Sequence, residues 1–209
     1  MKYEIGIINY GIGNIKSISN MLQKVGINFV VITNPSEIDN CKSLILPGVG
    51  AFDAAMEKLE SEKWVGPLYK FAKIECRPLI GICLGMQLLT KYSEEGKVPG
   101  LGFVDAKTLL FDKNKMVEKL RVPHMSWNLV KAAKENILFD SSKELKFYFV
   151  HSYHVVCNDK QDVLTTTDYG YNFVSSFCRG NIIGVQFHPE KSHHFGYSFF
   201  TKFIKGFVG

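Results

Sequence analysis

The chain has 209 residues, of which 46% are hydrophobic and 22% are charged, and these values are ordinary for a globular protein. A chain of this length can bury most of the surface that its unfolded form exposes, so it needs no disulfide to fold. Its formal net charge of +5 comes from 25 basic and 20 acidic residues scattered along the sequence. Without a block of like charge, the sequence predicts no nucleic-acid partner.

Cysteine usage and hydropathy indicate the cellular compartment of the protein. The five cysteines form no C-x-x-C pair, and an odd, dispersed set is not typical of a disulfide framework. The N-terminal segment lacks the long apolar core of a signal peptide. No stretch approaches the ~20 apolar residues that a membrane helix needs. We therefore predict a cytoplasmic protein with reduced thiols and no membrane partner.

The first half of the chain alternates short apolar runs with helical patterns. Strands are predicted at residues 3–9, 29–32, 44–46 and 78–82. Helices are predicted, from apolar residues that recur at intervals of three and four, at residues 15–25, 51–59 and 65–74. Strands that alternate with helices favour a parallel sheet covered on both faces.

Beyond Gly100 the pattern becomes one of short strands. Apolar runs predict strands at residues 103–110, 147–150, 163–167, 173–178 and 182–187. The last two flank Arg179-Gly180-Asn181, a hairpin signal, and helical spacing returns at residues 197–207. We therefore predict one domain over residues 1–209. Its fold class is α/β, with a mixed, mostly parallel central sheet flanked by helices and extended by antiparallel strands.

The run PLIGICLGMQLL contains the strongest candidate for a nucleophile. An apolar strand leads into Cys83, a helical pattern follows at once, and Gly81 and Gly85 flank the cysteine. This is the nucleophile-elbow pattern with cysteine in place of serine, in which small neighbours allow a sharp, strained turn. The N-terminus of the following helix would favour thiolate over thiol. The other four cysteines are predicted to be structural, since free cysteine is commonly buried.

The run GVQFHPEKS supplies a candidate base far downstream, so the fold must bring it to the cysteine. A strand is predicted up to Phe187, with His188 at its end and Pro189 stopping the ladder. In an extended chain, Glu190 would place its side chain on the same side as His188. Imidazole can accept the thiol proton and later give it to ammonia, while a carboxylate orients the ring. Without Cys83, the same residues would equally fit a strand end beside a solvated glutamate.

Together these motifs resemble those of class I glutamine amidotransferases. GICLG is followed by Gln87, four residues after the cysteine, and PGVG lies at residues 47–50. The segments INYGIGN, LPGVGAF, VPHMSW, FVHSY and QFHPEKS span nearly the whole chain and resemble the glutaminase subunit of imidazole glycerol phosphate synthase. The resemblance implies that a triad of Cys83, His188 and Glu190 hydrolyses glutamine to glutamate and ammonia, without a cofactor or a metal ion.

The resemblance also assigns the residues around the substrate. The backbone N–H groups that it implies for an oxyanion hole belong to Gly48, Val49, Gly50 and Leu84. Donors aimed at the developing O⁻ typically contribute several kcal/mol. The residues that it implies for glutamine binding, partly through backbone groups, are Gln87, His151, Ser152 and Tyr153. Taken alone, PGVG would fit a plain turn, Gln87 a surface amide, and residues 151–153 a polar strand end.

A partner enzyme is part of the same resemblance. The residues implied to lie near the interface are Asn14, Met125, Trp127 and Lys191. The implied partner is a (β/α)8-barrel synthase subunit, which forms a heterodimer with the glutaminase and uses its ammonia to make imidazole glycerol phosphate in histidine biosynthesis. Such glutaminases are nearly idle until the synthase binds its own substrate. Without the resemblance, Trp127 would fit ordinary core and Lys191 a solvated charge.

One residue departs from the family pattern. Ser126, in PHMSW, stands where the family usually has glycine, and glycine allows backbone angles that serine resists. We expect this position to lie in a loop near the interface. The departure motivates an alternative acceptor for the ammonia, namely a sugar nucleotide that is aminated in surface-polysaccharide synthesis by a paralogous pair of subunits.

An interpretation from another class is a non-catalytic or metal-binding regulatory module. Its candidate ligands are His151, His154, His193 and His194. His151 and His154 fall in a strand-like run, where a spacing of three should point the rings to opposite faces. Histidine ligands also need fixed geometry and supporting partners. We therefore expect no metal site.

Overall fold

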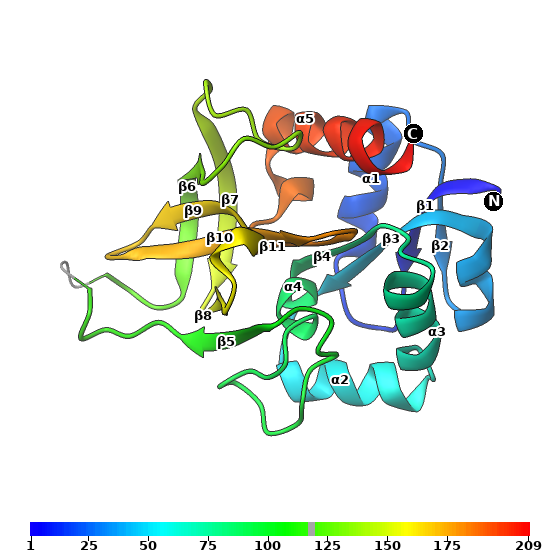
Figure 1. Cartoon of the computed structure of the whole chain (residues 1–209), viewed down its shortest axis with the longest axis horizontal. Coiled ribbons are helices and arrows are strands. Elements are labelled where there is room, and N and C mark those ends of the chain that lie inside the picture. The colour runs from blue at the N-terminus through cyan, green and yellow to red at the C-terminus, as the bar shows by residue number, and fades with distance from the viewer. Residues whose placement is uncertain (117–119) are drawn as a thin grey trace.

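The computed structural model of the chain describes residues 1–116 and 120–209, and eleven strands of these residues form one sheet (Figure 1). The strands are β1 (Tyr3–Ile8), β2 (Phe29–Ile32), β3 (Cys41–Gly48), β4 (Leu79–Cys83), β5 (Ala106–Leu110), β6 (His124–Ala132), β7 (Leu145–His151), β8 (Tyr153–Cys157), β9 (Val163–Asp168), β10 (Asn172–Arg179) and β11 (Ile182–Val185). The α-helices are α1 (Ile15–Val25), α2 (Phe52–Ser61), α3 (Val65–Tyr69), α4 (Leu84–Leu88) and α5 (His193–Phe203). A π-helical turn extends α3 (Lys70–Ile74) and another extends α5 (Ile204–Val208). Short 3-10 turns cover Pro35–Asn40, Lys160–Asp162 and Pro189–Lys191.

The parallel half of the sheet runs in the order β2-β1-β3-β4-β11. Its central strands consist largely of isoleucine, leucine and valine, and β4 and β11 are buried along their whole length. Such runs fit strands that are covered on both faces. The prediction of a parallel first half, with strands near residues 3–9, 29–32, 44–46 and 78–82, is therefore confirmed.

Helices cover both faces of this half, as Figure 1 shows, with α1 and α5 on one face and α2 and α3 on the other. The helix α1 is capped at its N-terminus by Asn14, whose side chain accepts a hydrogen bond from the N–H of Ser17, and at its C-terminus by Gly26, whose φ of +82° suits glycine. Ile18 and Leu22 of α1 are fully buried against the sheet. All the predicted helices are present within a few residues of the expected bounds.

The antiparallel half continues through β10, β9, β6 and β7, and β8 pairs with both β10 and β5. The predicted hairpin is confirmed, since Arg179 of β10 pairs with Ile182 of β11 across Gly180 and Asn181. Gly180 has a φ of +60°, which a tight hairpin turn requires. The central sheet thus joins a parallel half to an antiparallel half at β11.

Two strands escaped the sequence-based prediction. In β6 the usual alternation is inverted, because Met125, Trp127 and Leu129 are exposed while His124 and Val130 are buried. An apolar run pointing to solvent and a polar residue pointing inward hide the pattern of a half-buried strand. The strand β8 was missed because it follows β7 after a single intervening residue, and His151, Ser152 and His154 interrupt the apolar pattern there.

Ser126 lies in β6 and not in a loop, which corrects our expectation. It pairs with Phe149 of β7 in regular antiparallel register. Its φ is not positive, and the extended backbone of a strand suits any side chain. Serine at this position therefore imposes no backbone cost.

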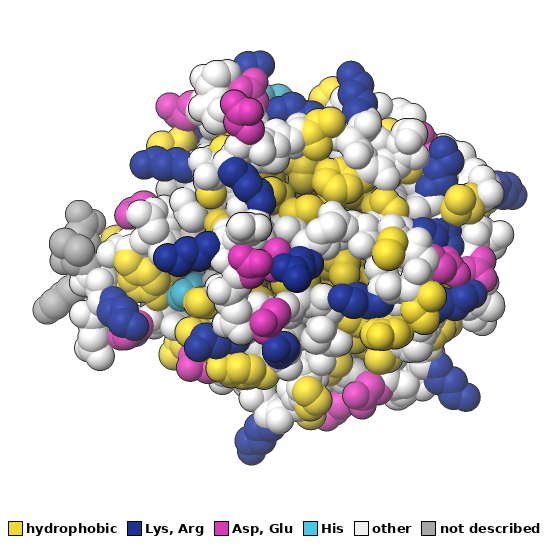
Figure 2. All heavy atoms as spheres, in the orientation of Figure 1, with side chains coloured by type: hydrophobic (Ala, Val, Ile, Leu, Met, Phe, Trp, Pro, Cys, Tyr) yellow, Lys and Arg dark blue, Asp and Glu magenta, His cyan; other side chains and the backbone are white. Residues whose placement is uncertain are grey.

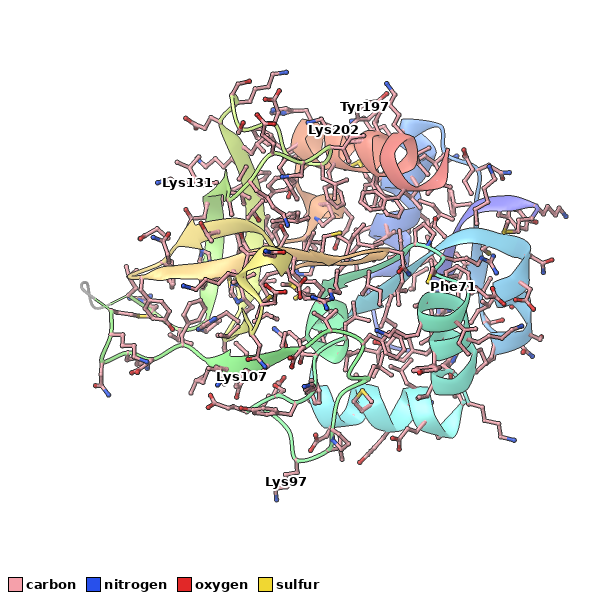
Figure 3. All side chains as sticks on the ribbon, viewed as in Figure 1. Phe71, Lys97, Lys107, Lys131, Tyr197 and Lys202 are labelled. Atoms are coloured by element: carbon pink, nitrogen blue, oxygen red, sulfur yellow. The ribbon has the colours of Figure 1, made fainter. Side chains whose placement is uncertain are left out.

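The surface carries charges of both signs. On the face drawn in Figure 2, Lys and Arg side chains are interspersed with Asp and Glu. Figure 3 shows Lys97 and Lys131 pointing into solvent on different sides of the molecule. Within the described residues, none of the helices combines the length and apolarity that crossing a bilayer requires.

The sharp turn after β4 provides a stability test. A Cβ added to Gly85 would collide with the carbonyl oxygen of Leu46, which is backbone and cannot move aside. We expect Gly85→Ala to lower the free energy of unfolding by about 3 kcal/mol, measured by urea denaturation. The control is Gly66→Ala in α3, where an added Cβ meets no atom within 4 Å. A Gly85→Ala protein as stable as the control would contradict this packing.

Candidate active site

Cys83 sits at the carboxyl end of β4, between its neighbours β3 and β11, and α4 begins at the next residue. Its backbone has φ +54° and ψ −113°, a strained combination for a residue with a side chain. A Cβ on Gly81 would lie 2.5 Å from the carbonyl oxygen of Gly85, so glycine is required at this turn. The predicted nucleophile elbow is present in the structure.

The sulfur of Cys83 faces a pocket of about 320 Å³. The pocket is lined by Val49, Gly50, Cys83, Leu84, Gln87, Glu95, Pro123, Val150, His151, Ser152, Tyr153, His188 and Lys191. Cys83 is 7% exposed, so most of its surface is covered by the surrounding protein. The Nε2 of Gln186 lies 3.7 Å from the sulfur, and the carbonyl oxygen of Val150 lies 3.9 Å from it. The candidate nucleophile thus lies near one polar group from β7 and one from the residue that follows β11.

The candidate base and its orienting carboxylate are in contact. His188 Nδ1 and Glu190 Oε1 are 2.8 Å apart, and both side chains are buried. The backbone N–H of His188 donates to the carbonyl of Tyr148 at 2.9 Å, which anchors the ring's main chain to β7. Our extended-chain explanation was wrong in its geometry, because residues Pro189–Lys191 form a 3-10 turn. The turn, rather than a strand, folds the carboxylate back onto the imidazole.

The protonation of His188 follows from its neighbours. Burial disfavours the imidazolium, but the charge of Cys83 and the hydrogen-bonded Glu190 carboxylate outweigh it and raise the pKa of His188 to about 10. Its Nε2 has no hydrogen-bond partner among the described residues and belongs to the same pocket as Cys83. At neutral pH this balance favours the imidazolium form of His188 beside the Cys83 sulfur.

The residues expected around the substrate lie mostly in the pocket wall. Val49, Gly50 and Leu84 line it, whereas Gly48 does not. Gly48 pairs with Cys83 across β3 and β4, and a Cβ there would lie 2.7 Å from the N of Gly85. Its place in the structure is thus one of close backbone packing behind the pocket.

The four residues expected to bind glutamine all line the pocket. Gln87 uses its amide within the protein, donating to the carbonyl of Tyr153 at 3.3 Å and to Oε1 of Gln186 at 3.0 Å. The bonded pair of Gln87 and Gln186 lies directly behind the sulfur. Gln87 therefore supports the pocket wall as well as lining it.

Sequence reasoning missed Gln186, which lies beside the sulfur, and three residues that line the pocket, Glu95, Pro123 and Val150. Gln186 is fully buried and touches both Cys83 and Gln87, yet we assigned it no role although it lies in the QFHPEKS motif. Glu95 lines the pocket from the loop after α4, and Pro123 lines it next to β6. No local pattern identifies Glu95 or Pro123, because each reaches the pocket through the path of a loop.

The residues expected at a partner interface fall on one strand and two other elements. Met125 and Trp127 project from β6 and are 60% and 37% exposed. The Trp127 ring stacks on His193 at 5.4 Å with an interplanar angle of 2°. Lys191 lines the pocket and sits over the Tyr148 ring at 5.8 Å. Asn14 lies apart from this group, as the cap of α1.

The histidines considered as metal ligands make other contacts. His151 and His154 do not point to opposite faces, because both rings pack on Phe111, at 5.3 and 4.9 Å. The strand breaks at Ser152 between β7 and β8, which resets the alternation. Among the described residues, no group of three or more His, Cys, Asp or Glu side chains is arranged to hold a metal ion. The metal-binding interpretation thus has no support from this geometry.

Comparison with known proteins places the chain in a family. The family model described as "Glutamine amidotransferase class-I" matches residues 6–205. The chain belongs to the class I glutamine amidotransferase family. Among curated relatives, "Imidazole glycerol phosphate synthase subunit HisH 2" of Methanococcus maripaludis is 49% identical and covers 96% of this chain and 98% of the relative. The protein of the same name from Pseudomonas aeruginosa is 43% identical with the same coverage. "Imidazole glycerol phosphate synthase subunit HisH" of Sulfurimonas denitrificans is 44% identical over 96% of this chain and 97% of the relative.

Solved structures share the fold at lower identity. "Structure of PurLQS from Thermotoga maritima" matches with a TM-score of 0.75 and 17% identity over 98% of this chain and 99% of the other. "Crystal structure of glutamine amidotransferase" matches with a TM-score of 0.74 and 17% identity over 96% and 97%. These similarities confirm the predicted α/β fold with its mixed sheet.

The raised pKa of His188 can be measured by NMR titration of its ring. Because the folded chain holds this proton more tightly than the unfolded chain, the pair contributes stability that is full below pH 6.5 and lost as the pH rises through about 10. We expect Cys83→Ala and Glu190→Gln each to lower the pKa of His188, because each removes a negative neighbour. Cys157→Ala, a change in β8, should leave the pKa unchanged. A pKa of His188 that stays the same in Cys83→Ala would contradict the ion pair.

Proposed function

We propose that the chain is a glutaminase subunit that hydrolyses the side-chain amide of glutamine and delivers the ammonia to a synthase subunit. The observation that carries the proposal is the meeting, in one pocket, of Cys83 on its strained turn with the bonded pair of His188 and Glu190. Nucleophile, base and orienting carboxylate are the parts that acyl transfer from an amide needs.

The first half of the reaction forms a thioester. The Cys83 thiolate attacks the amide carbon, and the carbonyl oxygen takes up the negative charge of a tetrahedral intermediate. Backbone N–H groups of Leu84 and of Val49 or Gly50, which line the pocket, would receive this oxygen. The carbon–nitrogen bond then breaks while the His188 imidazolium gives its proton to the nitrogen, so that ammonia leaves.

The second half restores the enzyme. His188, now neutral, accepts a proton from water as the water oxygen attacks the thioester carbon. Collapse of this second intermediate breaks the carbon–sulfur bond, releases glutamate and returns Cys83 to the thiolate beside the imidazolium. Glu190 holds Nδ1 of the ring at 2.8 Å, so Nε2 faces the reaction in both halves. Glu95 supplies a negative charge in the pocket wall, which complements the α-ammonium group of glutamine.

The names of the relatives and the surface of β6 support a synthase subunit as the partner that receives the ammonia. The curated relatives are named as subunits of imidazole glycerol phosphate synthase, which implies a second subunit for each of them. In this chain Met125, Trp127 and Leu129 form an exposed apolar row beside the pocket residue Pro123. We infer that this row docks a (β/α)8-barrel synthase subunit, which makes imidazole glycerol phosphate for histidine biosynthesis.

A sugar nucleotide is the alternative acceptor that the sequence raised. The relatives designated "HisH 2" are also named as subunits of imidazole glycerol phosphate synthase, which supports the histidine pathway. In the alternative, the ammonia goes to a synthase that aminates a sugar nucleotide. Expression in a histidine auxotroph that lacks its glutaminase subunit separates the two acceptors. Growth without histidine, when the cognate barrel subunit is co-expressed, supports the histidine pathway, and failure to grow while glutaminase activity persists supports the sugar nucleotide.

Substitutions in the triad test the reaction. With the partner bound, we expect Cys83→Ala to lose glutamine hydrolysis and His188→Ala to lose nearly all of it, by more than about 10³-fold. Glu190→Gln should keep more activity than either, because it orients the ring without reacting. The matched control is the exposed cysteine in Cys76→Ser, which should hydrolyse glutamine normally. Normal hydrolysis by Cys83→Ala would overturn the assignment.

The docking row can be tested by calorimetry with the barrel subunit. Trp127 is the largest side chain of the row, and truncation of such an anchor typically weakens binding by about 2 kcal/mol or more. We therefore expect Trp127→Ala to raise the dissociation constant about 30-fold. Ile74→Ala is the control, because Ile74 is exposed on the turn after α3, far from β6 in Figure 1. Equal weakening by both variants would exclude β6 as the docking surface.

A further inference from the structure

We propose that His124 is a positioning residue for glutamine hydrolysis, because a hydrogen-bonded chain of fixed direction runs from Asn128 through His124 and His151 to the carbonyl of Tyr153 in the pocket. The chain contains three contacts. Asn128 Nδ2 lies 3.3 Å from His124 Nε2, His124 Nδ1 lies 3.1 Å from His151 Nε2, and His151 Nδ1 lies 2.7 Å from the Tyr153 oxygen. The inference rests on the proposed glutaminase function.

The inner end of the hydrogen-bonded chain, at the carbonyl of Tyr153, fixes the tautomer of His151. A carbonyl oxygen can only accept, so the hydrogen between Tyr153 and His151 must be on Nδ1 of His151. In a neutral imidazole the other nitrogen is then an acceptor. Nε2 of His151 therefore accepts, and Nδ1 of His124 must donate to it. This leaves Nε2 of His124 as an acceptor.

The outer end of the hydrogen-bonded chain, at Asn128, independently gives the same bond direction. The Asn128 amide faces the carbonyl of Asp168 at 2.8 Å, so its NH₂ group and not its oxygen must lie there. The same NH₂ group is the one that reaches Nε2 of His124. Nε2 of His124 is thus an acceptor, as the inner end requires. Both ends impose one direction on every bond in between.

Burial keeps both rings neutral, which this direction requires. Burial lowers the pKa of His124 to about 4 and holds the pKa of His151 well below its ordinary value. The His124 ring is also clamped in place, stacked on Phe149 at 4.8 Å and on Tyr169 at 3.9 Å. A neutral, clamped ring has one orientation and one tautomer, so it can hold His151 in a single position.

The inner end of the chain is the pocket wall itself. The Tyr153 carbonyl that accepts from His151 also accepts from Gln87, which bonds the Gln186 amide beside the sulfur. The neighbouring carbonyl of Val150 faces Cys83. The carbonyl of Tyr153, one of the residues expected to hold the substrate, is therefore held by His151 on one side and by Gln87 on the other. Loss of the donor to His151 would free one of these two restraints.

The outer end of the chain lies on the strand whose other face carries the docking row. Met125, Trp127 and Leu129 point out of β6, and His124 lies on the inward face. Residues on opposite faces of one strand move together, because they share a backbone. A partner docked on the row therefore contacts the strand that carries His124, and His124 pairs directly with His151 of β7. The chain gives β6 a direct route to the part of the pocket that holds glutamine.

The test uses a pair of substitutions at His124 in the complex with the barrel subunit. His124→Phe keeps an aromatic ring of similar size and removes the donor, which leaves Nε2 of His151 unpaired in a buried site. His124→Asn keeps an N–H at the place of Nδ1. We expect His124→Phe to lower kcat/KM for glutamine at least about tenfold, mainly through KM, and His124→Asn to recover most of it. The rate of Cys83 alkylation by iodoacetamide should stay within about twofold of the unsubstituted protein, since the ion pair is untouched.

Two further measurements keep the test decisive. Nitrogen-15 NMR of the histidine rings should show Nδ1-protonated tautomers for His124 and His151, and His124→Phe should shift the Nε2 signal of His151 toward an unbonded value. This arm does not depend on glutamine hydrolysis, so failure of the glutaminase assignment and failure of the chain are distinguishable. If His124→Phe does not fold, the same measurements are made on Asn128→Leu. This substitution removes the donor to Nε2 of His124 and leaves Asp168 unchanged. A kcat/KM within twofold, an equal loss of alkylation, or the opposite tautomers would overturn the proposal.

Discussion

The structure depends on a close approach of three backbone segments around the nucleophile. Gly48 at the end of β3, Gly81 in β4 and Gly85 in α4 leave no room for a side chain between one another. Only this packing allows α4 to begin immediately after β4, and it holds Cys83 at a positive φ with its sulfur in the pocket. The turn after β3 and the strand β11 flank β4, so the candidate oxyanion donors and the candidate base arrive from its two neighbours.

Much of this arrangement could be predicted because its signals are local. The glycines around Cys83, the proline after His188 and the alternation of strands and helices each lie within a few residues of the feature they indicate. The pairing of His188 with Glu190 was predicted, but its cause was not, because a 3-10 turn and a strand can both bring residues two apart together. Which strands neighbour β4 was beyond the sequence, since that depends on pairing over about a hundred residues.

The parts that could not be predicted involve buried polar groups with distant partners. We assigned His124 no role from the sequence, because its partner His151 lies 27 positions away and Asn128, which supports it, is held by the carbonyl of Asp168. Burying such a group is unfavourable unless every polar atom is bonded, and only the folded sheet supplies those bonds. The same strand exposes Trp127, which inverts the usual pattern. In β6 the outward face is apolar and the inward face carries a polar, hydrogen-bonded histidine. The strand therefore lacks the alternation of buried apolar and exposed polar residues by which strands are predicted.

Histidines of one molecule are held in opposite states of protonation by the same physical balance. His188 is buried, but Cys83 and Glu190 supply negative charge, so its imidazolium is stabilised. His151 is buried without such a neighbour, and His188 itself opposes a second positive charge there. The proton that the leaving nitrogen takes up is therefore held at His188 and not at His151. Because the neutral rings cannot exchange roles with the charged one, the groups that hold the substrate remain hydrogen-bonded while the group beside the sulfur loses and regains its proton.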